Sequence, residues 1–531
     1  MAFSHNAGTW FRERQDMSGQ IDLLLVTPPS RAIVYQELSK DYAAIEPPVW
    51  SLLIAEHIRR LGWSVAVLDA EALGLSYDET ARRIAAADAR LNAFMIYGQQ
   101  PSASTQCMPA AVLTAKATAR LTDRPCIALG THPSALPART LDETTFDYVC
   151  QGEGPTTIAQ LLEHLSGRRS VESVAGLWWH RDGAPVSNGW APKIKDLDQA
   201  LPTQAWDLVD MSLYRAHNWQ SFGAPHRRQP YLSIQTSLGC PYACSFCCIN
   251  APFGGNGIRY WSPDAIVAQI DHVVARYGVQ MIKIPDEMFV LNKRHVLGIC
   301  DRLIERGYDL NIWAYARIDT IQREFLDKLR AAGFRWLGLG IESASGYVRD
   351  GVEKGRFDNA AITSVVRQVQ DAGIHVSSNF IFGLPDDTMD SMQETLDFAL
   401  DLNTDWANFY AAMAYPGSKL HQVATERGWL LPESPGGPGW IGYSQHAFET
   451  LPLPTEHLSA MQVLEFRDAA FQAYYSNPAY LALVDKKFGP ETSAHIKQMT
   501  DITLQRRHHE DPAYYDRLLG AQAARHPHPA A

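Results

Sequence analysis

Residues 230–248 read Pro-Tyr-Leu-Ser-Ile-Gln-Thr-Ser-Leu-Gly-Cys-Pro-Tyr-Ala-Cys-Ser-Phe-Cys-Cys. The apolar run 231–235 predicts a strand, and the loop after it carries Cys240, Cys244 and Cys247 at spacings of four and three residues. Three cysteines in one loop can ligate three corners of a single [4Fe–4S] cluster and leave the fourth iron without a protein ligand. Because that iron is open to a second molecule, this loop is the candidate active centre.

The same cysteines could instead belong to a zinc site or to the protein core. A zinc site usually shows two pairs of Cys or His ligands, and no second pair lies near this loop. Cys248 could complete a set, but consecutive side chains point in different directions in most backbone conformations. Unligated core cysteines are not expected to gather in a loop so rich in Gly and Pro. The pattern therefore favours an iron–sulfur cluster.

Residues 229–430 alternate short apolar runs with helical patterns. Such repetition predicts a parallel sheet, and six units fit an open, partial (βα)6 barrel rather than a closed barrel of eight. The helices have recognisable starts, such as Ser262-Pro263-Asp264, where an N-cap residue precedes a first-turn proline. The chemistry of such barrels lies at the carboxyl ends of the strands. The predicted strands are 231–235, 281–284, 311–314, 336–340, 376–382 and 406–412.

Residues 21–167 show a second series of strands and helices. Strands are predicted at 21–26, 64–69, 93–97, 126–130 and 148–150, with a helix at 50–61 that Gly62 ends. This alternation indicates a doubly wound, Rossmann-like sheet, which binds ligands in the loops beyond the carboxyl ends of its strands. We therefore expect a cofactor-binding domain ahead of the barrel.

The remaining parts of the chain complete the predicted α/β fold. Residues 1–20 are an N-terminal extension. Residues 168–228 are a connector with a β-hairpin around Asp182-Gly183, and its charged, proline-punctuated part, 191–211, is expected to run over the surface. Residues 431–531 follow a breaker rich in Pro and Gly and are expected to be mostly amphipathic helix.

Composition and charge exclude several classes of protein. The chain has 531 residues, of which 46% are hydrophobic and 20% charged, as in ordinary globular proteins. Its formal net charge is −11 with both signs mixed along the chain, which argues against a general nucleic-acid or anionic-membrane binder. Residues 1–20 lack the apolar core of a secretory signal, and no apolar run is long enough to span a membrane. We expect a cytoplasmic, monomeric protein.

The cysteine loop and its setting resemble the radical SAM superfamily. The matching features are the Cys-x3-Cys-x2-Cys spacing, the aromatic Phe246 before the last cysteine, and the position after the first strand of a six-unit barrel. In that family S-adenosylmethionine (SAM) chelates the open iron through its amino and carboxylate groups. One-electron reduction then releases a 5′-deoxyadenosyl radical, which removes a hydrogen atom from the substrate.

The resemblance implies SAM contacts at the ends of the later barrel strands. An acidic pair would face the ammonium of SAM, and Arg317 would hold its carboxylate in a bidentate contact. Taken alone, each position also has a structural interpretation: Arg317 could form a surface ion pair, and Gly383-Leu-Pro385 could be only a turn. The candidate SAM residues, besides Phe246, are Asp286, Glu287, Arg317, Glu342, Ser343, Gly383, Pro385, Tyr415 and Pro416.

The N-terminal sheet resembles the domain that precedes the barrel in the cobalamin-binding members of the superfamily, often called class B. Its strand-end loops are rich in small and hydroxyl residues, which suits the amide fringe and nucleotide tail of a corrinoid. His132 could be the lower ligand of cobalt, but the chain lacks the Asp-x-His-x-x-Gly motif, and a histidine satisfied by loop hydrogen bonds is favoured. The candidate cobalamin-binding residues are Pro29, Ser30, Gln99, Ser102, Gly130, Thr131, His132, Ser134, Gly152, Glu153 and Gly154.

Together these features predict a cobalamin-dependent radical SAM methyltransferase. It would move a methyl group from methylcobalamin to an unactivated carbon, or another poorly nucleophilic centre, of a small biosynthetic substrate after hydrogen-atom abstraction. Such a carbon has no lone pair for polar methylation, so the cofactors must supply the reactivity. The expected partners are that substrate and an electron donor such as flavodoxin or ferredoxin, with no nucleic acid and no membrane.

Two rival functions stay open. A cyclase, ring-contraction or rearrangement enzyme would use the same two cofactors without methyl transfer. A methylthiotransferase acting on RNA or protein is a remote alternative, because it needs a second cluster held by N-terminal cysteines. Cys107, Cys126 and Cys150 are the only candidates for that cluster.

Overall fold

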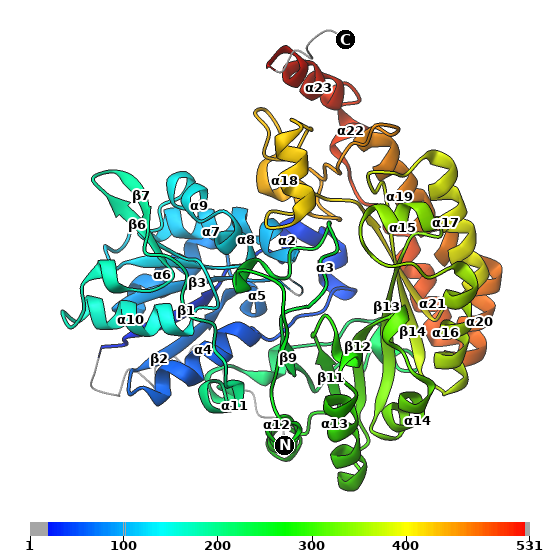
Figure 1. Ribbon diagram of the computed structural model, residues 1–531, viewed down its shortest axis with the longest axis horizontal. Helices are drawn as coiled ribbons and strands as arrows, with labels where there is room; N and C mark the ends of the chain where they lie inside the picture. The colour runs from blue at the N-terminus through cyan, green and yellow to red at the C-terminus, as the bar shows by residue number, and fades with distance from the viewer. Residues whose placement is uncertain (1–19, 99, 101, 526–531) are drawn as a thin grey trace.

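The computed structural model describes residues 20–98, 100 and 102–525. The predicted extension, apart from Gln20, and the candidate residue Gln99 lie outside the described residues. The chain forms an N-terminal α/β unit, blue and cyan in Figure 1, beside a half-barrel in green and yellow. Helices in orange and red follow the barrel along its outer side and top. This is the predicted fold class.

The N-terminal sheet has seven strands in the order β2-β1-β3-β4-β5-β6-β7. The first five are parallel, and β3 (Leu91–Ile96) is buried along its whole length, as expected for a sheet covered on both faces. The other strands are β1 (Leu23–Thr27), β2 (Val65–Asp69), β4 (Cys126–Gly130) and β5 (Tyr148–Cys150). The predicted hairpin, β6 (Leu177–Arg181) and β7 (Ala184–Ser187), extends this sheet by pairing antiparallel with β5.

Helices of the N-terminal unit pack on both faces of its sheet (Figure 1). The helix α4 (Val49–Arg60) begins one residue from the predicted start and ends at the Leu61-Gly62 turn. The others are α2 (Arg31–Tyr35), α3 (Leu38–Asp41), α5 (Ala70–Leu73), α6 (Tyr77–Ala87), α7 (Ala103–Thr118), α8 (Thr131–Ala135), α9 (Pro137–Glu143) and α10 (Pro155–Leu165).

The second sheet has six parallel strands in the order β15-β14-β13-β12-β11-β8. Each strand neighbours the next in chain order, which is the predicted open (βα)6 arrangement. The strands are β8 (Tyr231–Ser233), β11 (Met281–Ile284), β12 (Asn311–Arg317), β13 (Phe334–Glu342), β14 (His375–Phe382) and β15 (Trp406–Ala411). A two-stranded ribbon, β9 (Ser237–Leu238) and β10 (Arg259–Tyr260), frames the cysteine loop.

The barrel helices begin and end at the expected signals. In α12 (Pro263–Tyr277), Ser262 caps the first turn by accepting a hydrogen bond from the amide of Ala265, and Gly278 ends the helix with φ +65°. The other helices of the barrel are α13 (Lys293–Arg306), α14 (Arg323–Ala331), α15 (Gly346–Gly351), α16 (Asn359–Asp371) and α17 (Met389–Leu402).

The C-terminal region is helical, as predicted. It contains α18 (Lys419–Glu426), α19 (Ala460–Tyr475), α20 (Pro478–Phe488), α21 (Pro490–Thr500), α22 (Arg507–Glu510) and α23 (Tyr514–Arg525). Short 3-10 turns occur at Val171–Ser173, Trp206–Leu208, Met211–Leu213, Trp219–Ser221, Ala251–Phe253, Phe289–Leu291, Ile318–Thr320 and Gly439–Tyr443. In the described part of the chain, no helix has the length and apolarity that crossing a membrane requires.

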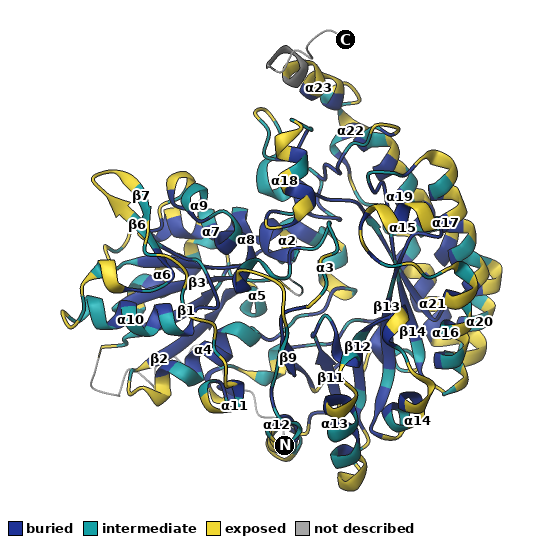
Figure 2. Cartoon of the chain, viewed as in Figure 1, coloured by how far each residue is buried: buried dark blue, intermediate teal, exposed yellow. Residues whose placement is uncertain are grey.

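The connector is more buried than its composition suggested. It includes α11 (Leu197–Ala200), and Leu197, Leu201 and Trp206 are each at most 2% exposed. These side chains join a single apolar cluster that contains Leu52 of the N-terminal unit and Leu232 of the barrel. The expectation that 191–211 runs over the surface is therefore wrong for Leu197, Leu201 and Trp206, which pack among residues of both units. Figure 2 shows that the sheets of both units are largely buried, whereas exposed residues lie on the outer helices.

Candidate active site

The cysteine loop is held by hydrogen bonds from its own neighbourhood. Asn250 accepts from the amide of Cys240 at 3.1 Å and donates to its carbonyl at 2.9 Å, and the amide of Gly257 donates to the same carbonyl at 3.0 Å. The amide of Cys247 donates to the carbonyl of Cys244 at 3.0 Å. The glycine-rich segment 254–257 is thus tied back to the loop through Gly257.

We call the cavity that the three cysteines line the cysteine cavity. Its walls are the cysteine loop and the carboxyl ends of five barrel strands, as the resemblance implied. The residues that line it include Ser102, Cys240, Tyr242, Cys244, Phe246, Cys247, Cys248, Ile249, Glu287, Tyr315, Arg317, Gly340, Glu342, Lys354, Leu384, Tyr410, Ala411, Ala412, Met413, Tyr415 and Gln445.

The cysteines fit a cluster better than a single ion. Burial raises the pKa of Cys240 to about 11 and that of Cys247 well above its usual value, so both thiols lose their protons only when iron binds. No three His, Cys, Asp or Glu side chains in the described part of the chain are placed to hold one metal ion. A cluster does not require three side chains around one ion, because it needs only one cysteine at each of three irons.

Arg317 lies inside the cysteine cavity and not on the surface. Its Nη1 is 3.5 Å from the Sγ of Cys244, and its guanidinium lies 4.0 Å above the ring of Tyr242. The carboxylate of Asp319 accepts hydrogen bonds from Nε and Nη2 of Arg317, at 2.9 and 3.0 Å. The guanidinium is thus oriented beside the cysteines by a carboxylate and an aromatic ring.

A buried ion pair that the sequence did not reveal lies beside Arg317, whose Nη2 donates to the carbonyl of Lys354. The ammonium of Lys354 donates to the carboxylate of Glu342, which is one of the candidate SAM residues. Burial alone would lower the pKa of Lys354, but Glu342 beside it raises that pKa, so the ammonium keeps its charge. Nothing in the sequence around Lys354 marks it, because it comes from a loop twelve residues beyond the strand end.

The two acids that follow β11 have different surroundings. Asp286 accepts hydrogen bonds from the amide and hydroxyl of Thr236 and from the hydroxyl of Ser237, at 2.6–2.8 Å, so it ties β11 to the chain that leads into the cysteine loop. Glu287 lines the cysteine cavity, and burial raises the pKa of its carboxyl to about 7. Only Glu287 of the pair faces the cysteines.

The other candidate SAM residues divide in the same way. Phe246 and Tyr415 line the cysteine cavity. Ser343 lies behind it, where its hydroxyl is 3.1 Å from that of Thr395. Gly383, with φ +79°, ends β14 in a turn closed by Asp387, and a Cβ there would meet Val463 of α19 at 2.5 Å. Gly383 is therefore required by the packing of α19 against this turn. Leu384 lines the cysteine cavity, while Pro385 and Pro416 lie in the turns beside it.

A second cavity lies between the N-terminal unit and the barrel, and we call it the interdomain cavity. Five wall residues each have a buried side-chain polar atom without a hydrogen-bond partner in residues 20–98, 100 and 102–525: Thr27, Arg31, Ser51, Tyr97 and Gln235. Such atoms are costly unless a ligand satisfies them. A corrinoid, whose rim carries many amides, fits this requirement.

Sequence reasoning found some walls of the interdomain cavity and missed others. Ser30 and Thr131 line it, as predicted cobalamin residues should. Glu71 was missed: its carboxylate accepts from the amides of Ser30 and Arg31 at 2.5–3.1 Å and so fixes the loop after β1. Cys107 was also missed, with its Sγ 3.3 Å from the hydroxyl of Ser30. Both come from neighbouring strand units, so no local pattern reveals them.

His132 is placed as a structural residue. It is 1% exposed, its Nδ1 is 3.3 Å from the hydroxyl of Thr105, and its ring packs edge-on against Trp440 at 4.4 Å. Burial lowers its pKa to about 3, so the ring is neutral. No histidine among the described residues lines the interdomain cavity.

The remaining candidate cobalamin residues contact protein outside this cavity. Gly130 packs against β3, where a Cβ would meet the carbonyl oxygen of Ile96 at 2.0 Å. Ser134 accepts from the amide of Gly152 at 3.2 Å, and Glu153 pairs with Arg259 of the ribbon. Gly152, Glu153 and Gly154 line a separate small pocket, Ser102 lines the cysteine cavity, and Pro29 lies in the loop before Ser30.

The two cavities meet. Gln100, Ile249 and Glu287 line both of them. Molecules bound in the two cavities would therefore face each other across this junction, with Glu287 at its edge.

The three N-terminal cysteines do not gather into a second site. Cys126 begins β4 and Cys150 ends β5, and these parallel strands place them at opposite ends of the sheet. Cys107 lies in α7 against Ser30. The methylthiotransferase alternative has no support in this arrangement.

Comparisons with known proteins agree with the two cavities. Residues 234–399 match the family model of the radical SAM superfamily, and residues 40–162 match that of the B12 binding domain. A relative from Pyrococcus horikoshii, the uncharacterized methyltransferase PH0819, is 26% identical over 461 residues, which are 86% of this chain and 93% of the relative. An anaerobic magnesium-protoporphyrin IX monomethyl ester cyclase from Rubrivivax gelatinosus is 24% identical over 465 residues, or 84% of this chain and 77% of the cyclase.

The fold is also similar to that of a solved structure. The radical S-adenosylmethionine methyltransferase TsrM from Kitasatospora setae, solved with cobalamin and a [4Fe-4S] cluster bound, superposes with a TM-score of 0.63 at 18% identity, over 87% of this chain and 90% of TsrM. The two matched domains follow each other in the order predicted from the sequence, and the relatives include methyltransferases. The chain is a cobalamin-dependent radical SAM enzyme, and its matches support the predicted methyltransferase activity.

Proposed function

We propose that this chain transfers a methyl group from methylcobalamin to an unactivated carbon, or another poorly nucleophilic centre, of a small molecule. The observation that carries the proposal is the junction of the two cavities at Gln100, Ile249 and Glu287. Methyl transfer to a carbon radical requires donor and acceptor to meet within contact distance, and the adjacency of the two cavities at these residues supports such an arrangement.

The chain's own residues suit the parts assigned to them in this proposal. Cys240, Cys244 and Cys247 would hold the cluster, and Arg317, Glu342 and Lys354 form a set of opposite charges suited to the carboxylate and amino groups of SAM. Ser30, Thr131 and the unpaired polar atoms of Thr27, Arg31, Tyr97 and Gln235 would hold the corrinoid. Ser343, Ser134 and Gly130 are assigned supporting roles behind these walls.

The bound cofactors supply the reactive groups: the cluster with SAM provides a hydrogen-abstracting radical, and methylcobalamin provides the methyl group. The residues of the chain orient these molecules and keep water away. Phe246, Tyr315, Tyr410 and Met413 make the cysteine cavity largely apolar, so few polar groups compete for the radical. Glu287, whose carboxyl has a pKa raised to about 7 by burial, can hold a proton at the junction.

Further parts of the proposal concern the setting of the enzyme. We propose a monomer in the cytoplasm that receives electrons from a flavodoxin- or ferredoxin-like protein, with the cobalamin-binding domain at 21–167 and the radical SAM barrel at 229–430. The cysteine cavity supports a small-molecule substrate, because it is a lined pocket and not an open surface.

A second candidate function is supported by a specific finding. The similarity to the magnesium-protoporphyrin IX monomethyl ester cyclase extends over 84% of this chain, so the same cofactors without methyl transfer form the rival proposal. The two proposals differ in their products from SAM. A methyltransferase remakes methylcobalamin from SAM and releases S-adenosylhomocysteine, whereas the rival releases none.

The test is anaerobic reconstitution with iron, sulfide and hydroxocobalamin, followed by mass spectrometry of the products from methyl-labelled SAM. We expect 5′-deoxyadenosine and S-adenosylhomocysteine, with label appearing on cobalamin and then on the substrate. Formation of 5′-deoxyadenosine without S-adenosylhomocysteine or labelled cobalamin would refute methyl transfer and favour the rival.

A further inference from the structure

A loop of the C-terminal region, residues 444–450, touches the N-terminal unit beside the interdomain cavity, and we call it the bracket loop. The hydroxyl of Ser444 donates to the carbonyl of Val34 at 3.0 Å, and Gln36 donates to the carbonyl of His446 at 2.6 Å. The ring of His446 packs on that of Tyr35 at 5.4 Å. Because Val34 and Tyr35 line the interdomain cavity, the bracket loop supports one of its walls from behind.

The same loop also touches the cysteine cavity. The amide group of Gln445 accepts from the backbone N–H of Ala411 and donates to its carbonyl, both at 2.9 Å, at the end of β15. Both Gln445 and Ala411 line the cysteine cavity. Seven residues of chain therefore join the walls of two cofactor cavities.

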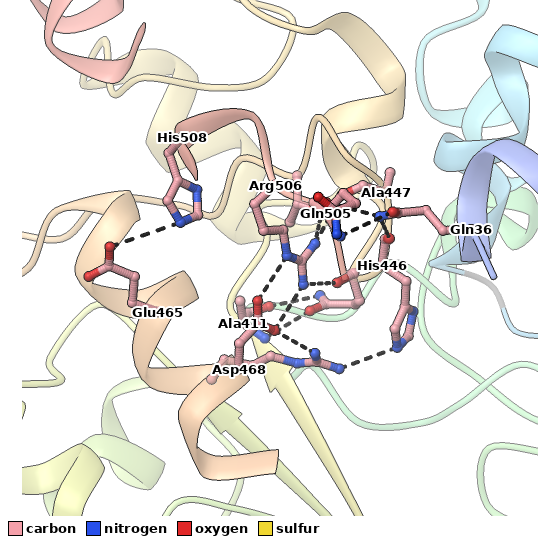
Figure 3. Close-up of polar contacts among 12 residues, drawn as sticks. Gln36, Ala411, His446, Ala447, Glu465, Asp468, Gln505, Arg506 and His508 are labelled. Carbon is pink, nitrogen blue, oxygen red and sulfur yellow. Dashed lines mark hydrogen bonds and ion pairs between the residues drawn. The ribbon is translucent and has the colours of Figure 1, made fainter. Parts of the chain in front are cut away.

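Arg506 holds the bracket loop in place, as Figure 3 shows. Its side chain is fully buried. Nη1 donates to the carbonyl of Ala447 at 2.9 Å and to the hydroxyl of Thr450 at 2.7 Å, and Nη2 donates to the carbonyl of Gln445 at 3.0 Å. A guanidinium has five N–H groups in a fixed fork, and three of them are spent on this one loop.

The other two N–H groups of Arg506 anchor the fork to helix α19. Nε and Nη2 each donate to Asp468, both at 2.9 Å. Asp468 also accepts from Arg467 at 2.8 Å, and Arg467 donates to the carbonyl of Phe409 in β15 at 2.8 Å. The loop is thus fixed to the barrel through a chain of charged hydrogen bonds that leaves no N–H of Arg506 unpaired.

The segment that carries Arg506 reaches the N-terminal unit as well. The backbone N–H of Gln505 donates to the side-chain oxygen of Gln36 at 3.2 Å, and the backbone carbonyl of Gln505 accepts from the side-chain nitrogen of Gln36 at 3.1 Å. Gln36, in the turn after α2, is therefore gripped by both Gln505 and the bracket loop. These contacts span more than four hundred residues of sequence.

We propose that Arg506 is a positioning residue that sets the shape of both cofactor cavities at once through the bracket loop. It touches neither the cysteines nor the interdomain cavity, and it acts by holding Gln445 against β15 and His446 against α2. This assignment rests on the two cofactor domains and not on methyl transfer, so it applies equally to a cyclase. It gives the C-terminal region, which lies outside both matched domains, a part in cofactor binding.

The proposal is tested by measuring the dissociation constants of the reconstituted protein for hydroxocobalamin, by absorbance, and for SAM, by the change in the EPR spectrum of the reduced cluster. Lysine keeps the charge of Arg506 but cannot form the fork. Loss of charged hydrogen bonds to the loop should weaken both affinities about tenfold in Arg506→Lys. The matched control is Arg517→Lys, whose exposed guanidinium pairs with Asp511 and has no hydrogen bond to the bracket loop, and both its affinities should stay unchanged.

Two further variants separate the two sides of the bracket loop. Gln36→Leu removes the hydrogen bonds that tie the N-terminal unit to His446 and Gln505. It should weaken hydroxocobalamin binding about threefold while leaving SAM binding unchanged. Gln445→Leu removes the contact with Ala411 and should alter the SAM-dependent EPR change while leaving cobalamin affinity unchanged. All measurements are made well below the melting temperature of each variant, so that folded protein is compared with folded protein.

Three results would overturn the proposal. One is a folded Arg506→Lys protein with both affinities unchanged. Another is an equal loss of affinity in Arg517→Lys, which would show a general effect of the C-terminal segment. The third is a Gln36→Leu protein that loses SAM affinity as strongly as cobalamin affinity, which would show that the loop does not serve the two cavities separately.

Discussion

The cysteine cavity and the interdomain cavity are built in opposite ways. The cysteine cavity takes its three ligands from eight consecutive residues and its charged walls from strand ends, and Arg317, Glu342 and Lys354 all have charged partners. The interdomain cavity takes its walls from two units, and five of its polar side chains have a buried atom without a partner in the described residues.

This difference shows which cavity is complete before its cofactor arrives. Charges that already balance one another keep their positions without a ligand, whereas unpaired buried polar atoms gain their partners only when a ligand binds. The cysteine cavity is therefore organised by the protein and the interdomain cavity by the protein together with its cofactor. Each of the following variants tests one side of this contrast.

The largest effect is expected at the cysteine loop. Cys244→Ala should abolish the cluster and all formation of 5′-deoxyadenosine, because three ligands are the minimum that a site-differentiated cluster requires. The control is Cys248→Ala: Cys248 is buried next to Cys247 and should not ligate, so cluster content should stay normal. Iron analysis, absorbance and product formation check both. Normal cluster content in Cys244→Ala would contradict the assignment of the triad.

A large effect on stability is expected at the interdomain cavity. Glu46, which precedes α4, accepts from Lys283 of β11 at 3.1 Å and from the hydroxyls of Tyr231 and Ser233 at 2.7 Å. Burial alone would raise the pKa of Glu46, but Lys283 lowers that pKa, so the carboxylate is ionised. Removing one partner of a buried pair costs about 3–5 kcal/mol, so Glu46→Ala should lower the free energy of unfolding by that amount.

Denaturant unfolding measures this effect, and an exposed ion pair provides its control. Glu324 accepts from Lys293 at 2.6 Å with more than half of each side chain exposed, so Glu324→Ala should cost less than about 1 kcal/mol. If Glu46→Ala were as mild as Glu324→Ala, the docking of the two units would not depend on this contact. The interdomain cavity would then depend on the docking of the two units less than its walls indicate.

A smaller effect is expected from the contacts that tie the two cavities together. Burial alone would raise the pKa of Asp468, but the guanidinium groups of Arg467 and Arg506 lower it to about 2. Because the folded pKa lies below the unfolded one, the stabilisation is full above about pH 5 and is lost as the pH falls toward 2. The difference in unfolding free energy between wild type and Asp468→Asn should shrink by about 1 kcal/mol from about pH 6 to about pH 3.

Urea titrations of both proteins at the two pH values measure that difference. A difference that stays constant with pH would show that Asp468 is not held ionised by the two arginines. The anchor of Arg506 would then be weaker than its geometry indicates.

The smallest effect is expected at His132. Its imidazole is neutral and packed against Thr105 and Trp440, and no histidine in the described part of the chain lines the interdomain cavity. His132→Gln should therefore change hydroxocobalamin affinity by less than about threefold. The EPR spectrum of the cob(II)alamin form should show no splitting from a protein nitrogen in either protein. Such a splitting in the wild type, lost in the variant, would make His132 the lower ligand after all.

Features that depend on neighbouring residues could be predicted from the amino-acid order. The Cys240–Cys247 spacing predicted the cluster ligands, the alternation of apolar runs with capped helices predicted both sheets, and strand ends located Glu287, Arg317 and Glu342. The structure confirms both sheets, because strand burial and helix capping are set by residues a few positions apart, whereas the assignment of the cluster ligands stays a prediction from their spacing.

Packing between distant segments determines which of those residues share a cavity. Lys354, Glu71 and Cys107 were missed, and Ser134, Glu153 and Gly130 contact protein rather than the interdomain cavity. Arg506 acts on a loop some sixty residues away, and Gln36 meets Gln505 across almost the whole chain. Such contacts are fixed by how the two units and the C-terminal helices pack, and no periodicity in the sequence records a partner that is distant along the chain.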